Sequence, residues 1–210
     1  MSLQYKCTKT DELLQKYPII SDQVDAGELR ALLLLLEEQL QKGVVGSVVE
    51  LGCYVGTTSL FIRRLLDAYN ADVEFHVYDS FAGLPPKVAQ DESPLGVQFV
   101  EGELCATKRQ FYDNFKKAGL PAPTVHKAWF RDLTFDDIPE RVMFAFLDGD
   151  YYCSIRDSLR VIKPRLTKDA IIVVDDYANE ALPGTACAVD EWLAANSRSL
   201  CIQKSLAVIR

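Results

Sequence analysis

Several features that mark nucleic-acid-binding, membrane-spanning or secreted proteins are missing from this sequence. It has no surplus of basic residues, since 23 Lys and Arg stand against 30 Asp and Glu, for a net charge of −7. Binding to phosphate backbones or anionic membranes needs such a surplus, so we expect neither a nucleic-acid nor a membrane partner. The apolar run ALLLLLEEQL (31–40) is too short to cross a bilayer, and the polar N-terminus MSLQYKCTKTDE does not resemble a signal peptide. We therefore expect a soluble, cytoplasmic protein.

Cysteine and histidine give no sign of a metal or disulfide framework. The six cysteines are scattered and form no C-x-x-C pair. This pattern is typical of small buried apolar side chains in a reducing compartment. The two histidines, His76 and His126, each fall inside an expected strand. We interpret both as structural, so a histidine-based metal site is not expected.

The rest of the chain alternates between strand-like and helix-like segments. Apolar, β-branched runs predict strands at 47–52, 73–80, 123–130, 141–150 and 169–176. Helical spacing predicts helices within 11–17 and at 21–43 (capped by Ser21 or Asp22), 57–70, 106–119, 154–167 and 185–197. Residues 199–210 look like a terminal β-hairpin. The alternation implies an α/β fold with a mostly parallel sheet covered on both faces.

This length and a hydrophobic content of 49% suit one domain with a substantial core. Within it we expect residues 1–44 to be an N-terminal helical segment packed on a core formed by 45–210.

A glycine turn follows the first expected strand, in VVELGCYVGTTSL. It contains Glu50, Gly52 and Gly56, in the pattern E-x-G-x-x-x-G. This is neither the G-x-G-x-x-G of dinucleotide binders nor a P-loop, and a turn needed only for strand–helix packing would look the same. Asp79, at the tip of the second expected strand, is placed to accept hydrogen bonds from a ribose diol. Together, these residues favour a nucleoside ligand.

Two later strands end in acids, in FAFLDGDYY (144–152) and IIVVDDY (171–177). The tips of neighbouring parallel strands lie side by side, so Asp148, Asp175 and Asp176 should converge. Mutually repelling carboxylates need a cation or protons, and an all-oxygen set favours Mg²⁺. Asp148 is the better candidate for a catalytic base and Asp150 the weaker one. Alternatively, some of these acids cap helices or face solvent.

Other functions use a similar arrangement. Phosphohydrolases of the haloacid dehalogenase type also carry D-x-D and paired acids at strand tips. Here, however, D-G-D falls late in the chain, and only one helix fits between it and the acid pair. A nucleoside-binding protein without catalysis is a third alternative, in which the acids would be incidental.

Five motifs in order resemble the macrocin O-methyltransferase family: VELGCYVGTTS, VYDSFAGLPP, HKAWFRDL, FLDGDYYCSIRDSL and IIVVDDYANE. The resemblance covers roughly residues 45–195, whereas the loop 87–105 departs from the family pattern. It implies S-adenosylmethionine-dependent, metal-assisted methylation of sugar hydroxyls on macrolides and related natural products. It also implies the Rossmann-like class I methyltransferase fold, a seven-stranded sheet whose last strand is antiparallel.

The resemblance also assigns site residues. For the S-adenosylmethionine site these are Glu50 and Gly52 at the methionine end, Asp79 and Ser80 at the ribose, and Trp129 and Phe130 near the adenine. Tyr54, Gly56, Thr57 and Asp148 are also assigned to this site. Asp148, Asp175 and Asp176 match the family's Mg²⁺ ligands, and Asp148 matches its proposed base. The expected partner is a small hydroxylated acceptor molecule, and a homodimer is compatible with the sequence.

Overall fold

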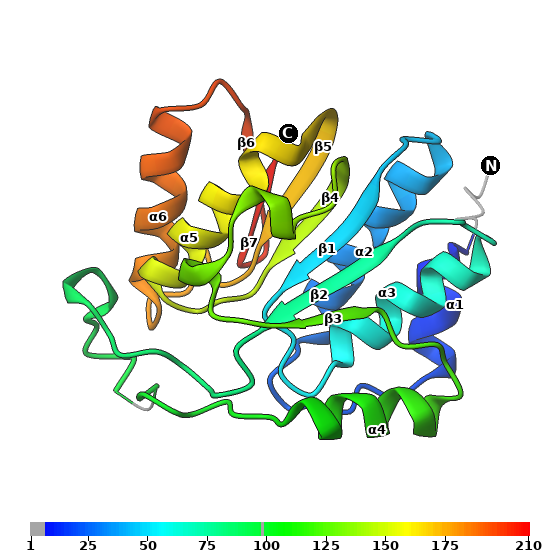
Figure 1. Ribbon diagram of the computed structural model, residues 1–210, viewed down its shortest axis with the longest axis horizontal. Coiled ribbons are helices and arrows are strands. Elements are labelled where there is room, and N and C mark those ends of the chain that lie inside the picture. The colour runs from blue at the N-terminus through cyan, green and yellow to red at the C-terminus, as the bar shows by residue number, and fades with distance from the viewer. Residues whose placement is uncertain (1–6, 98) are drawn as a thin grey trace, which may run out of the picture.

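The computed structural model describes residues 7–97 and 99–210, which build a seven-stranded sheet with helices on both faces (Figure 1). The strand order is β3-β2-β1-β4-β5-β7-β6. Neighbours from β3 to β5 pair in parallel, whereas β7 pairs antiparallel with both β5 and β6. The strands are β1 (Ser47–Leu51), β2 (Phe75–Asp79), β3 (Thr124–Lys127), β4 (Val142–Leu147), β5 (Leu166–Val174), β6 (Leu200–Gln203) and β7 (Leu206–Ile209). The expected sheet and terminal hairpin are confirmed.

In the part of the chain that the structure describes, six α-helices cover the two faces of this sheet. They are α1 (Lys9–Lys16), α2 (Ala26–Gln41), α3 (Thr57–Ala68), α4 (Lys108–Ala118), α5 (Tyr152–Ile162) and α6 (Pro183–Ala194). Side chains alternate across a strand, so β1 sends Val48 into the core beneath α2 and α3 and Val49 into the core beneath α5 and α6. In Figure 1 these two helix layers lie on opposite sides of the sheet.

Several element boundaries differ from the sequence prediction: the helix expected at 154–167, for example, ends at Ile162, and β5 begins at Leu166. Two further differences bear on the site. Helix α2 begins at Ala26 and is capped by Asp25, not by Ser21 or Asp22, because Asp25 Oδ1 accepts hydrogen bonds from Gly27 N (2.9 Å) and Glu28 N (3.0 Å). Strand β3 ends at Lys127, so Trp129 precedes and Phe130 begins a short 3₁₀ turn, η2 (Phe130–Asp132).

A buried carboxylate on α2 ties α1 to the rest of the molecule. Glu37 on α2 accepts hydrogen bonds from Lys9 N (3.0 Å), Thr10 N (3.2 Å), Thr10 Oγ1 (2.6 Å) and the Tyr69 hydroxyl (2.7 Å). Burial acts to raise the pKa of Glu37, but the bonds from Thr10 and Tyr69 outweigh it and hold the pKa below its ordinary value. Helix α1 is thereby fixed on α2, while a division of the chain at residue 44 stays a prediction.

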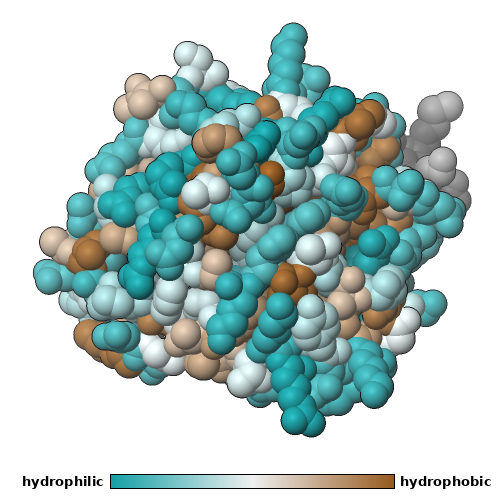
Figure 2. Space-filling view, viewed as in Figure 1, coloured by the Kyte–Doolittle hydropathy of each residue, from teal (hydrophilic) through white to brown (hydrophobic). Residues whose placement is uncertain are grey.

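The surface seen in Figure 2 is hydrophilic over most of its area, with apolar residues in small scattered groups. In the described part of the chain, no helix combines the length and apolar character that a membrane span requires.

Candidate active site

A cavity of about 600 Å³ opens at the carboxyl ends of the parallel strands. Each of β1, β2, β4 and β5 is followed within three residues by a non-glycine residue with positive φ: Tyr54 (47°), Phe81 (51°), Asp150 (59°) and Asp176 (56°). Such left-handed backbone costs about 1–3 kcal/mol per residue and is concentrated at functional sites. The strained turns therefore mark this edge of the sheet as the candidate site.

The two glycines after β1 have clear packing reasons. At Gly52 (φ +96°) an added Cβ would lie 1.8 Å from the carbonyl oxygen of Asp148, so the tips of β1 and β4 can approach only without a side chain there. Gly56 (φ +87°) directly precedes α3, and its Cβ would lie 2.8 Å from the ring of Phe111. Packing alone thus accounts for the glycine pattern, and the evidence for a ligand must come from polar groups.

Two buried polar atoms flank this turn, one on β1 and one on α3, and neither has a hydrogen-bond partner among the described residues. Glu50 is fully buried, and its Oε2 accepts a hydrogen bond from the Ser59 hydroxyl, while Oε1 has no partner within the described residues. Burial raises the pKa of Glu50 to about 8, with a smaller contribution from Asp79. Thr57 Oγ1 is likewise buried and without a partner among them. Both residues line the cavity, and buried polar groups without a partner there suit a polar ligand.

Asp79 joins the turns that follow β1 and β2. Its Oδ2 accepts hydrogen bonds from Cys53 N (2.9 Å) and Tyr54 N (3.3 Å), and its Oδ1 accepts one from Phe81 N (2.7 Å). A carboxylate has about four acceptor positions, so about one remains for a ligand. Ser80, next to Asp79, also lines the cavity.

Three carboxylates meet at the tips of β4 and β5. Asp148, Asp150 and Asp176 each offer an oxygen, and the three oxygens lie within 4.8 Å of one another. Burial raises the pKa of all three, that of Asp150 to about 8, and repulsion between neighbouring acids adds to the shift. Asp148 also feels Asp175 most strongly among these neighbours. The three carboxylates are therefore destabilised when all of them are ionised and no cation offsets their charge.

This group differs in one member from the predicted set of Asp148, Asp175 and Asp176. Asp175 lines the cavity but also borders Glu28 of α2, and its Oδ1 accepts a hydrogen bond from Asp176 N (3.0 Å). Successive residues at a strand end point to opposite faces, and the left-handed backbone at Asp150 gives that side chain a new direction. A metal site completed by Asp175 stays a prediction, and Asp150 is the alternative third ligand.

The described parts of the loop, residues 87–97 and 99–105, form a wall of the cavity and are anchored to α5. Asp91 is buried and accepts hydrogen bonds from Tyr152 N (2.7 Å), at the start of α5, and from Val88 N (3.0 Å). The Ser93 hydroxyl donates to the carbonyl of Glu180 (2.7 Å). Apolar side chains near this wall line the cavity, namely Leu84, Pro85, Phe99 and Leu104.

The structure also brings in residues that the sequence did not single out. The segment before α2 lines the cavity, as do Cys153, Ser154 and Asp157 of α5. The spacing of Ser154 and Asp157 places them on one helix face, a signal present in the sequence. Nothing in the sequence of the segment 21–28 indicates that it reaches a strand edge so distant along the chain.

Solved structures share this architecture. The O-methyltransferase NovP superposes with a TM-score of 0.75 at 25% identity, covering 88% of this chain and 79% of that one. The calicheamicin methyltransferase CalS11 superposes with the same TM-score at 19% identity, covering 96% of this chain and 89% of that one, which supports the fold alone. The strand order and the antiparallel last pair are those of the class I methyltransferase fold, as predicted.

Sequence relatives give a narrower assignment. A tetracenomycin 4'-O-methyltransferase acting on a dimethoxyrhamnosyl derivative, from Streptomyces olivaceus, is 32% identical over 70% of this chain, and this chain spans 58% of its length. Mycinamicin III 3''-O-methyltransferase from Micromonospora griseorubida is 31% identical over 85% of this chain and 72% of its own length. The family model described as macrocin-O-methyltransferase (TylF) matches residues 19–204. The chain therefore belongs to the macrocin O-methyltransferase family, as its motifs predicted.

Proposed function

We propose that this protein uses S-adenosylmethionine to methylate a hydroxyl of a sugar carried by a natural product, with help from Mg²⁺. The observation that carries the proposal is that two sets of groups line the same cavity. One set is the unpartnered polar groups beside the β1 turn, and the other is the acids at the tips of β4 and β5. The relatives' named reactions, all O-methylations of natural products, support the same chemistry. Membership of the family speaks against the phosphohydrolase alternative.

The residues around the β1 and β2 turns fit S-adenosylmethionine. The free Glu50 Oε1 and Thr57 Oγ1 suit the amino-acid end, since an ammonium group would donate to both. The open acceptor position on Asp79 suits a ribose hydroxyl, and Trp129 and Phe130 supply aromatic surface for the adenine. When bound, this cofactor supplies an electrophilic methyl group on a positively charged sulfur, and the acidic cavity favours that charge.

The acid group fits a hard divalent cation. Asp148 and Asp176, with Asp150 or Asp175, would hold Mg²⁺ through carboxylate oxygens, and the cation would offset the repulsion that raises their pKa values. When bound, it supplies Lewis acidity that lowers the pKa of the acceptor hydroxyl.

Methyl transfer also requires a group of the protein that accepts the proton of the acceptor hydroxyl. When the acceptor oxygen bonds to the methyl carbon and the sulfur–carbon bond breaks, the hydroxyl loses its proton, which needs a base within hydrogen-bonding reach. Asp148 is the candidate, because its backbone packs against Gly52 between the β1 turn and the acid group. The packed tips of β1 and β4 hold Asp148 next to both the proposed cofactor site and the acid group.

Binding of the demethylated cofactor tests the proposed function directly. Calorimetry should show that S-adenosylhomocysteine binds to the wild type and NAD does not. Asp79→Ala should weaken binding by roughly 1.5–3 kcal/mol, because a charge-assisted hydrogen bond to the ribose is lost. Asp132→Ala is the control, since Asp132 is exposed and lies outside the cavity lining. Unchanged affinity in Asp79→Ala would mean that the nucleoside binds elsewhere.

Metal removal tests the proposed role of Mg²⁺. EDTA should stop turnover and Mg²⁺ should restore it, with Zn²⁺ a poorer substitute at an all-oxygen site. Independently of activity, Mg²⁺ should raise the melting temperature of the wild type, because a ligand that binds only the folded state stabilises it. Asp176→Asn should reduce this rise. Full turnover in EDTA would remove the metal from the proposal and leave methyl transfer standing.

A further inference from the structure

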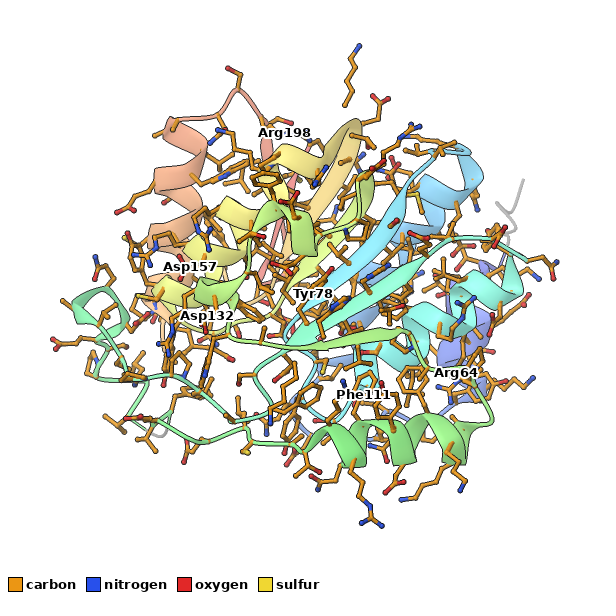
Figure 3. The ribbon with its side chains drawn as sticks, in the orientation of Figure 1. Arg64, Tyr78, Phe111, Asp132, Asp157 and Arg198 are labelled. Atoms are coloured by element: carbon orange, nitrogen blue, oxygen red, sulfur yellow. The ribbon has the colours of Figure 1, made fainter. Side chains whose placement is uncertain are left out.

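Among the acids that line the cavity, Asp157 of α5 is one that has no part in the chemistry proposed above. Asp157 lies on α5, one turn beyond Cys153 and Ser154, and all three side chains line the cavity. The wall facing them comes from Trp129 and Phe130 at η2. Figure 3 shows Asp157 on α5 beside the segment that carries Asp132, in agreement with the extensive packing of α5 on η2. We call the space between these five residues the base compartment.

The base compartment continues directly from Asp79. The carbonyl of Asp79 accepts a hydrogen bond from Ala128 N (2.9 Å), so Trp129 follows one residue from the proposed ribose position. Arg160 of α5 fixes the opposite wall, because its Nη2 donates to the carbonyls of Phe130 (3.3 Å) and Leu133 (3.2 Å). A nucleoside whose ribose lies at Asp79 and whose amino-acid end lies at Glu50 therefore has this compartment available for its base.

Among the described residues, hydrogen-bond donors reach one oxygen of Asp157 and not the other. Its Oδ1 accepts hydrogen bonds from Arg156 Nε (3.1 Å) and Nη2 (3.0 Å) and lies 3.8 Å from Arg160 Nε. Its Oδ2 forms no hydrogen bond with any residue that the structure describes, although the side chain is only 10% exposed. The compartment therefore presents a fixed, half-used hydrogen-bond acceptor next to aromatic surface.

We propose that Asp157 selects the base of the cofactor by accepting a hydrogen bond from the exocyclic amino group of adenine through Oδ2. An ionised carboxylate can only accept, so it suits the amino group at position 6 of adenine and repels the carbonyl oxygen that hypoxanthine carries there. Asp157 is then a specificity-determining residue for the cofactor. This inference rests on the proposed function, because it requires that the cavity bind S-adenosylmethionine.

The test compares two ligands that differ only at position 6 of the base and in the ring proton that goes with it. Calorimetry would measure the dissociation constants of S-adenosylhomocysteine and S-inosylhomocysteine. The wild type should prefer the adenine compound by about tenfold or more, the size expected when a site built around a hydrogen bond meets an analogue that cannot form it. In Asp157→Asn the amide can donate to the carbonyl oxygen, so the preference should fall several-fold.

Two variants separate base selection from a purely structural ion pair along α5. Arg156→Gln removes the partner of Oδ1 and keeps the carboxylate, so it should retain the wild-type preference. Asp132→Asn removes a nearby exposed charge and should also retain it. A second substitution, Asp157→Ser, supplies the same comparison should the asparagine variant fold poorly.

Each outcome decides between the alternatives. Equal affinities in the wild type, or a preference that survives Asp157→Asn, would overturn the role of Asp157 while S-adenosylhomocysteine binding upholds the proposed function. A preference lost equally in Arg156→Gln would mean that the ion pair only positions the helix. No binding of either compound by the wild type would overturn the proposed function and this inference together.

Discussion

Asp148→Asn should slow methyl transfer by about 10²–10⁴-fold, the contribution that a positioned general base makes. The amide oxygen can still ligate a cation but cannot take up a proton, so affinity for Mg²⁺ should fall much less than the rate. The measurement is a single-turnover rate at saturating Mg²⁺ and cofactor, with Mg²⁺ affinity followed separately by calorimetry.

Asp150→Asn is the matched comparison, because Asp150 belongs to the same carboxylate group and is, like Asp148, partly buried. A near-normal rate in Asp148→Asn with a collapse in Asp150→Asn would identify Asp150 as the base. Near-normal rates in both would mean that neither Asp148 nor Asp150 acts as the base. Neither variant should lower the melting temperature in EDTA, since each removes a carboxylate whose pKa burial and neighbouring acids have raised.

Gly52→Ala should have the largest effect on stability, lowering the free energy of unfolding by roughly 2–6 kcal/mol through backbone strain and overpacking together. The new Cβ would lie 1.8 Å from the carbonyl oxygen of Asp148, and backbone on both sides prevents an easy adjustment. Binding of S-adenosylhomocysteine should be lost with it, because the β1 turn cannot keep its position. Urea unfolding and calorimetry measure the two effects.

Gly119→Ala is the control for Gly52→Ala. Gly119 also has a positive φ (+68°), but nothing lies within 4 Å of its added Cβ. It should therefore show only the conformational part of the cost, about 1–2 kcal/mol. Equal losses in the two variants would mean that the close approach of β1 to β4 contributes nothing beyond backbone conformation.

The layout of the sheet could be predicted because it depends on local patterns. Alternating strands and helices determine a parallel sheet, and the apolar runs that become β1, β2, β4 and β5 are continuous because both faces are covered. Acids that directly follow such runs must lie at one edge. For this reason Asp79, Asp148 and Asp176 were expected at a common edge, and all three line the same cavity. Their roles toward a cofactor and a metal stay predictions.

Element ends were less predictable, because several local signals compete. Ser21, Asp22 and Asp25 are all residues that can cap a helix, and only the hydrogen bonds to Gly27 and Glu28 identify Asp25. Likewise, β3 ends before Trp129 although the apolar pattern continues to Phe130.

The sequence by itself determined the fold class, the strand edge that carries the site and the acidic character of that edge. Only the tertiary structure decided which carboxylates meet, because a left-handed turn at Asp150 redirects a side chain in a way that residue spacing does not encode. The same holds for Asp157 and for the loop that Asp91 fixes to α5, since their positions depend on how helices and loops distant in the chain pack together. Local periodicity determines which residues share a face, whereas long-range packing determines what that face meets.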